Sequence, residues 1–158
     1  MQTTIFHREG LFQAIGEQYA LDWNGIHGWD HWERVRETGL VLARENEANQ
    51  GVVELFSLLH DSCRLNDSRD PEHGPRAAVF AKDLHGLFFR LEDRGFDLLL
   101  TAIRDHTKGY VHHDPTIQVC WDADRLDLPR VGTRPRPKYF GTKAAKKILQ
   151  KISSRSNV

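Results

Sequence analysis

Apolar residues recur along this sequence with the period of an α-helix. In residues 51–64, Val52, Leu55, Phe56 and Leu59 occupy positions i, i+3, i+4 and i+7, the spacing of one buried helix face. Four further stretches share this spacing, and their inward residues are Val35 and Leu42; Ala77, Phe80, Ala81 and Leu84; Leu99, Ala102 and Ile103; and Ile117, Cys120 and Trp121. The pattern predicts five amphipathic helices in the middle of the chain.

Capping and breaking residues set the expected ends of these helices. Asp30 is expected to cap a helix over about 31–46, Gly109 to end one over about 96–107, and Pro115 to begin one that reaches about 128. The other predicted helices cover about 51–64, 73–89 and 142–152, with a short one within 1–25 and a proline-rich loop at 129–137. No segment shows the alternation of a strand. The predicted fold is all-α, a compact bundle of five to six helices.

Length and composition fit one globular domain. The 158 residues are 39% hydrophobic and 28% charged, which is typical of a folded chain. We expect a single domain over 1–158, with its core at about 25–130 and a C-terminal loop and basic helix over 131–158. The 22 basic and 22 acidic residues cancel, so the net charge favours binding neither to nucleic acid nor to a membrane. We expect neither as a partner, and the oligomeric state stays open.

The N-terminus and the cysteines favour a cytoplasmic location. Residues 1–12 mix acidic and basic side chains without a long apolar run, unlike a secretory signal, and no apolar stretch is long enough to span a bilayer. Cys63 and Cys120 do not form a CxxC pair. Free thiols in a reducing compartment are therefore expected, with a single disulfide as the alternative.

Each of the five central helices carries a histidine or an aspartate on its predicted inward face. These residues continue the apolar stripes at helical spacing, and they are His31, His60, His73, His106 and Asp124. A buried carboxylate without a partner is costly. Several imidazoles and carboxylates that converge can instead be satisfied together by one divalent cation, so the joint pattern predicts a metal site.

Simpler interpretations stand beside this one. A lone histidine on an apolar face is more often a hydrogen-bonded core residue than a ligand, and only the joint occurrence on five helices argues against that interpretation. His27 lies one turn before His31, and it either points at the same site or caps the first central helix. We favour the capping role for His27.

Three short motifs resemble the HD-domain phosphohydrolases. His31-Trp-Glu-Arg-Val35 looks like the HxxRV opening of that family, and Leu58-Leu59-His60-Asp61 resembles the helix that ends in its HD doublet. The segment Trp121-Asp122-Ala-Asp124-Arg-Leu-Asp127 is similar to the closing A-D-x-L element. The resemblance covers about Gly25 to Arg130. The GYP signature of the cyclic-dinucleotide phosphodiesterases is missing, which leaves the substrate open.

The resemblance implies a helical bundle that holds a divalent metal. Mixed imidazole and carboxylate ligands leave Mn, Fe, Mg, Co, Ni and Zn as the candidates. Carried over residue by residue, the ligands are His31, His60, Asp61 and Asp124. Asp124 is preferred to Asp122 because Asp124 occupies the A-D position and continues the apolar stripe. Some relatives hold two metals. His73 and His106 resemble the additional ligands of those relatives, with Asp61 as the natural bridge.

The expected activity is hydrolysis of a small phosphorylated molecule, such as a nucleotide or a phosphate monoester or diester. Asp61 is the candidate that orients the attacking water, and His106 either protonates the leaving group or binds a second metal. Arg64, Lys108 and Arg130 are the candidates that bind the substrate phosphate, since they flank the predicted ligands. The alternatives are a dinuclear-iron oxygenase or lyase on the HD scaffold, and a noncatalytic ligand-binding HD module.

Overall fold

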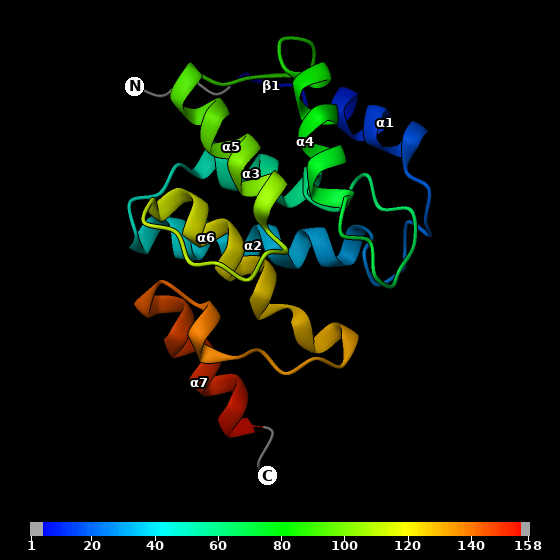
Figure 1. The fold of residues 1–158 in the computed structure, drawn as a ribbon. Helices are drawn as coiled ribbons and strands as arrows, with labels where there is room; N and C mark the ends of the chain where they lie inside the picture. Colours follow the sequence, from blue (N-terminus) through cyan, green and yellow to red (C-terminus); the bar gives the residue numbers. More distant parts are fainter. Residues whose placement is uncertain (1–4, 156–158) are drawn as a thin grey trace.

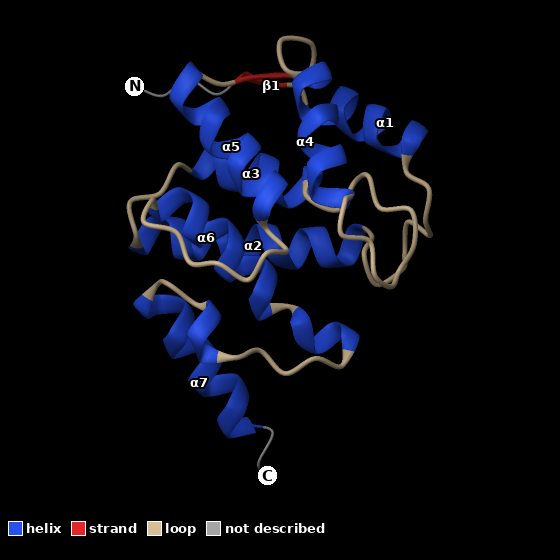
Figure 2. Cartoon of the chain, viewed as in Figure 1, coloured by secondary structure: helices blue, strands red, loops and turns tan. Residues whose placement is uncertain are grey.

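The chain folds into helices that pack around one hydrophobic core (Figure 1). The computed structural model describes residues 5–155. Within that range it contains seven α-helices and one short two-stranded sheet (Figure 2), which confirms the predicted all-α class. The helices are α1 (Arg8–Gln18), α2 (Trp29–Glu45), α3 (Gln50–Leu59), α4 (His73–Leu84), α5 (Asp93–Asp105), α6 (Pro115–Leu126) and α7 (Lys143–Arg155).

Helix α3 lies at the centre of the bundle. Asn49 caps its N-terminus by accepting a hydrogen bond from Val52 N, and seven of its ten residues are buried. Helices α2, α5 and α6 pack around it, while α4 packs mainly on α5 (Figure 1). The inward stripe of residues 51–64 is therefore the core face, and its last turn delivers the chain to the site described below.

The start of α2 and the end of α3 differ from the sequence-based prediction. Helix α2 begins at Trp29 after the N-cap Gly28, so Asp30 lies in the first turn and is not the cap. Helix α3 ends at Leu59, five residues earlier than expected, and the chain continues through tight turns in which Ser62 N donates to Leu59 O. Capping residues thus located the helices, but they did not fix the exact terminal residues.

The sequence missed a hairpin-like connection after α4. The helix expected over 73–89 ends at Leu84, and the chain turns at Gly86, whose φ of +87° suits glycine. Strand β2 (Phe89–Arg90) then pairs antiparallel with β1 (Ile5–Phe6). The expectation of no strand was wrong here because two-residue strands are too short for alternation to be visible.

The C-terminal segment is tied to the bundle by one buried carboxylate. Asp122 of α6 accepts hydrogen bonds from Thr142 N at 2.9 Å, Thr142 Oγ1 at 2.6 Å and Gly141 N at 3.2 Å. These bonds place α7 against α6, where Ala145 and Leu149 are buried. The loop expected at 129–137 includes two short 3-10 turns, η1 (Leu128–Val131) and η2 (Pro137–Tyr139).

None of the helices in residues 5–155 has the length and apolar character needed to cross a bilayer.

Candidate metal centre

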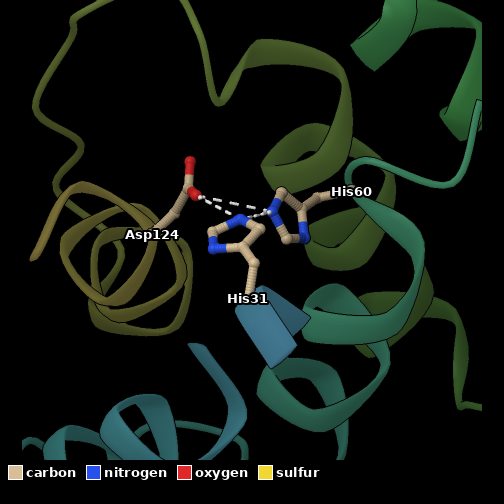
Figure 3. A group of neighbouring side chains, drawn as sticks. All are labelled: His31, His60 and Asp124. Atoms are coloured by element: carbon tan, nitrogen blue, oxygen red, sulfur yellow. Dashed lines mark hydrogen bonds and ion pairs between the residues drawn. The ribbon is translucent and has the colours of Figure 1, made fainter. Parts of the chain in front are cut away.

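Three ligand atoms from three helices meet inside the bundle (Figure 3). His31 comes from the first turn of α2, His60 from the end of α3, and Asp124 from the last turn of α6. His31 Nε2 lies 3.1 Å from His60 Nε2, and Asp124 Oδ1 lies 3.3 Å and 3.4 Å from these two nitrogens. The atoms are close enough to bind one ion together.

Asp61 joins this group to a second one. Its Oδ2 atom lies 3.5 Å from His31 Nε2 and 3.6 Å from His60 Nε2. Its Oδ1 atom lies 3.0 Å from His73 Nε2 and 3.5 Å from His106 Nε2. The two latter nitrogens are 2.9 Å apart. Asp61 is therefore placed to share its two oxygens between two ligand groups.

The ends of helices bring these side chains together. His60 and Asp61 directly follow the last residue of α3, His73 is the first residue of α4, and His106 follows the last residue of α5. The four histidines and Asp61 are at most 4% exposed, so bulk water does not satisfy their polar atoms. The structure thus brings together all six residues that the sequence and the family resemblance predicted as metal ligands.

The hydrogen bonds of the histidines prepare their Nε2 atoms for a cation. The Nδ1 atom of each faces an acceptor: Asp127 Oδ2 for His31, Phe56 O for His60, Asp70 O for His73 and Ile103 O for His106. A neutral imidazole that donates from Nδ1 carries only a lone pair on Nε2. The Nε2 lone pairs of His31 and His60 face each other, and so do those of His73 and His106. The lone pairs in each couple repel unless a positive charge lies between them. The donor set therefore fits divalent metal ions.

The electrostatics of the site lead to the same conclusion. Burial by itself lowers the pKa of His31, but the hydrogen bonds that Asp124, Asp127 and Asp61 accept from this imidazole outweigh burial and raise that pKa to about 10. Burial would also raise the pKa values of Asp61 and Asp124, but nearby histidines, His60 foremost, hold both well below the ordinary range. The raised pKa of His31 and the lowered pKa values of Asp61 and Asp124 both indicate that the site favours positive charge.

Two solved structures share this architecture. One is described as a predicted HD superfamily hydrolase from an uncultured Thermotogales bacterium. It aligns with a TM-score of 0.72 and 24% identity over 96% of this chain and 87% of its own. The second is described as an HD-superfamily hydrolase from Bacillus thuringiensis, with a TM-score of 0.55 and 19% identity over 95% and 96% of the two chains. The chain has the HD-domain fold. Neither the protein-family models nor the curated proteins gave a match.

This HD-domain fold also positions two residues that sequence reasoning did not assign to the site. Asp127 holds His31 Nδ1 at 2.7 Å and accepts a second bond from Arg34 Nε at 2.8 Å. His27 Nδ1 lies 3.2 Å from Asp61 Oδ2. The capping role expected for His27 is wrong, because Gly28 is the N-cap of α2 and the imidazole faces the ligand cluster. His27 lies in a loop, where no periodicity marks its direction.

A pocket of about 740 Å³ opens beside the ligand cluster of the HD-domain fold. Asp61, His106 and Asp124 reach its wall, and all three predicted substrate-binding residues line it. Arg64 Nε lies 3.3 Å from Asp61 Oδ1, and Arg130 Nη2 lies 4.0 Å from Asp61 Oδ2. Lys108 is half-exposed and pairs with Asp105 at 2.9 Å. Two guanidinium groups therefore flank the bridging carboxylate, while the lysine is partly neutralised.

Other basic residues of the C-terminal loop lie outside this pocket. Arg134, Arg136 and Lys138 lie between η1 and the start of α7. All three are exposed and none of them lines the pocket. Arg130 is held in place because its Nε donates to Ile26 O at 2.8 Å, which links the two loops that border the entrance.

Proposed function

We propose that this chain is a metal-dependent phosphohydrolase that acts on a small phosphorylated molecule, either a nucleotide or another phosphate monoester or diester. The position of Asp61 carries the proposal. Its two oxygens lie between two histidine pairs at the wall of a pocket that also presents Arg64 and Arg130. Phosphoryl transfer needs an activated water and concentrated positive charge around the phosphate, and this combination suits both needs.

The ligands divide naturally between two metal ions. His31, His60 and Asp124 would hold one ion, His73 and His106 the other, and Asp61 would serve both. When bound, such ions lower the pKa of a coordinated water and polarise a phosphoryl oxygen. His106 is assigned to binding, and not to protonating the leaving group, because its Nδ1 hydrogen is held by Ile103 O at 2.6 Å and its Nε2 faces Asp61.

Arginine side chains supply the phosphate contacts in this proposal. Arg64 and Arg130 both approach Asp61, and their side chains are 12% and 11% exposed, so both can meet a ligand without being fully solvated. Planar guanidinium groups bind phosphate oxygens in a bidentate manner. We assign substrate orientation to these two residues and a weaker, screened attraction to Lys108.

The rest of the pocket suits an organic group attached to the phosphate. Ile26, Leu128, Val131 and Tyr139 contribute its apolar lining. A sugar or a base can cover such a surface, whereas inorganic pyrophosphate or polyphosphate cannot use it. A nucleotide is therefore the substrate class that matches both the charged and the apolar parts of the pocket.

A dinuclear-iron oxygenase or lyase is the second candidate. The observation that favours it is the group formed by Asp61, His73 and His106, since this group completes a site for two ions. The flanking arginines favour hydrolysis of a phosphate ester over oxidation. Iron content and oxygen consumption with candidate substrates separate the two activities.

The first experiment is elemental analysis of protein purified without chelator or affinity-tag metal. The wild type is compared with Asp61→Ala and with Asp97→Asn, a control that removes an exposed carboxylate of α5. We expect about two equivalents of transition metal in the wild type and the control, and a large loss in Asp61→Ala. A panel of nucleotides and other phosphoesters is then assayed with the metal-loaded proteins.

Each result changes the proposal in a defined way. Metal-dependent release of phosphate that is absent from Asp61→Ala supports a phosphohydrolase. Iron as the dominant metal with oxygen uptake moves the assignment to the oxygenase. Metal binding without turnover of any phosphoester or oxygen would favour a noncatalytic module, and no metal after reconstitution would make the cluster structural.

A further inference from the structure

The neutral net charge hides a separation of charge along the chain. Nine of the 22 Lys and Arg residues lie in residues 128–158, and that segment contains no Asp or Glu. All 22 acidic residues precede it, so the segment carries a formal charge of +9 and the first 127 residues carry −9. Because a local surface and not the net charge governs the encounter with a large polyanion, the expectation drawn from neutrality does not apply to this segment.

Eight of the nine positive charges of this segment face solvent. Arg130 turns to the pocket and is the one basic residue after Asp127 with a salt bridge in residues 5–155. The exposed basic residues, which we call the basic track, are Arg134, Arg136, Lys138, Lys143, Lys146, Lys147, Lys151 and Arg155. The fold therefore leaves this charge available to a partner.

Helix α7 arranges half of the basic track in a row. Lys143, Lys147, Lys151 and Arg155 follow one another at intervals of four residues, which is a rise of about 6 Å for each step. The opposite face of α7 is fixed to the bundle through buried Ala145 and Leu149. Figure 1 shows this helix at the end of the molecule away from α4 and β1, and all four residues of the row are exposed.

An anionic membrane fits this surface poorly. Helices that lie on membranes insert an apolar face among the lipids. The apolar face of α7 is already turned to the bundle, where Ala145 is fully buried and Leu149 is 4% exposed. The basic track thus offers charge without an insertion surface, which is the pattern of a site for a phosphodiester backbone.

Aromatic side chains next to the basic track favour single strands over duplex. Tyr110 is 61% exposed, and the half-buried Tyr139 directly follows Lys138, whose ammonium lies 5.0 Å from the Tyr139 ring centroid. Arg125 Nη1 donates to the backbone oxygens of both tyrosines, at 2.7 Å and 2.6 Å, and so fixes their segments side by side. Unpaired bases can stack on exposed rings, whereas the bases of a duplex are already stacked.

We propose that the basic track, together with Tyr110 and Tyr139, binds single-stranded nucleic acid. The surface continues toward the pocket, because Tyr139 also lines the pocket wall. This binding needs neither the metal ligands nor the proposed hydrolysis. It is therefore measured on metal-free protein in the presence of chelator, where failure of the metal centre does not influence the result.

The test uses fluorescence anisotropy with a labelled oligothymidylate of about 20 nucleotides, which exceeds a single-strand site of ordinary size. The wild type is compared with the triple variant Lys143→Gln, Lys147→Gln, Lys151→Gln. The matched control replaces three exposed basic residues elsewhere, Arg69→Gln, Lys82→Gln and Arg90→Gln. A third variant, Lys143→Arg, Lys147→Arg, Lys151→Arg, keeps the charge.

We expect the α7 triple Gln variant to bind about tenfold more weakly or worse, with the slope of log K against log salt reduced by about 2 between about 50 and about 200 mM salt. The control and the Arg variant should bind like the wild type. Equal loss in the control, no binding by the wild type at low salt, or tighter binding to a duplex would overturn the proposal. So would binding to phosphatidylserine vesicles without binding to the oligonucleotide, or self-association of the chain that depends on α7.

Discussion

Asp127 Oδ2 accepts a hydrogen bond from His31 Nδ1 at 2.7 Å, and the other oxygen of Asp127 accepts one from Arg34 Nε at 2.8 Å. The carboxylate thus fixes the imidazole and its tautomer while an exposed arginine fixes the carboxylate. Carboxylates in this position orient metal-binding histidines and increase their basicity. Asp127 lies one residue beyond α6, whose last turn carries Asp124, so one short segment supplies both a ligand and the partner of another ligand.

Replacing Asp127 with Asn should weaken metal binding without removing a ligand. The amide keeps the shape of the side chain but loses the negative charge that holds the hydrogen of His31, so we expect affinity to fall about 10- to 100-fold. Competition with a metal-binding dye measures this change. Asp97→Asn is the control, because its carboxylate is exposed and makes no ion pair within the described residues. Unchanged affinity in Asp127→Asn would show that metal binding through His31 does not depend on this carboxylate.

The two ligand groups predict different metal contents for two Asn variants. Asp61 Oδ1 lies 3.0 Å from His73 Nε2, and Asp61 Oδ2 lies 3.5 Å from His31 Nε2. Asp124 contacts only the first group, through His31 and His60. Asp61→Asn should therefore lose most of both ions, and Asp124→Asn should retain about one equivalent held by the second group. Elemental analysis with a circular dichroism check of folding distinguishes these outcomes. Equal retention in the two variants would contradict the bridging role of Asp61.

Helical periodicity explains why so much of this centre could be predicted. His60, His106 and Asp124 continue apolar stripes, so the same spacing that marks the core face also predicts their direction. The spacing separates Asp124 from Asp122 as well. Asp124 lies within 3.4 Å of His60, whereas Asp122 bonds to residues 141 and 142.

Residues outside regular helices escaped this reasoning. His27 lies in the loop before α2, and Asp127 lies beyond the end of α6, so neither position has a helical phase that fixes its direction. The pairing of β1 with β2 joins residues that are more than 80 positions apart, and no local pattern reports it. The turn at Gly86 is local, because Gly86 N donates to Phe89 O, but it lies inside the segment predicted as one helix over 73–89.

Arg130 should act on substrate binding more than on folding. Its guanidinium contacts Ile26 O and His27 Nδ1, and its Nη2 lies 4.0 Å from Asp61 Oδ2. The Arg130 side chain also lines the pocket. Arg130→Ala should raise the KM for a phosphoester by about tenfold or more, in line with the loss of a charged hydrogen bond. Arg130→Lys should recover only part of this loss, because lysine has no planar fork. Steady-state kinetics with Arg69→Ala as the exposed control measures both effects, and an unchanged KM would exclude phosphate contact by Arg130.

Gly74 sets the distance between the helices that carry His73 and His106. A Cβ atom at this position would lie 2.8 Å from Ile103 O and 2.8 Å from Arg104 O, closer than real contacts allow. Ile103 O is also the acceptor that holds His106 Nδ1 at 2.6 Å. A side chain at Gly74 must therefore push α4 away from the end of α5 and disturb the orientation of His106.

Gly74→Ala should accordingly lower the free energy of unfolding by about 1–3 kcal/mol and reduce the metal content by about one equivalent. Gly16→Ala in α1 is the matched control, because its added Cβ would meet only the Trp23 side chain, at 3.9 Å. Alanine is also a better helix former than glycine. Chemical denaturation and elemental analysis measure the two effects separately. A stable Gly74→Ala protein with a full complement of metal would mean that α4 and α5 can separate without disturbing the second ligand group.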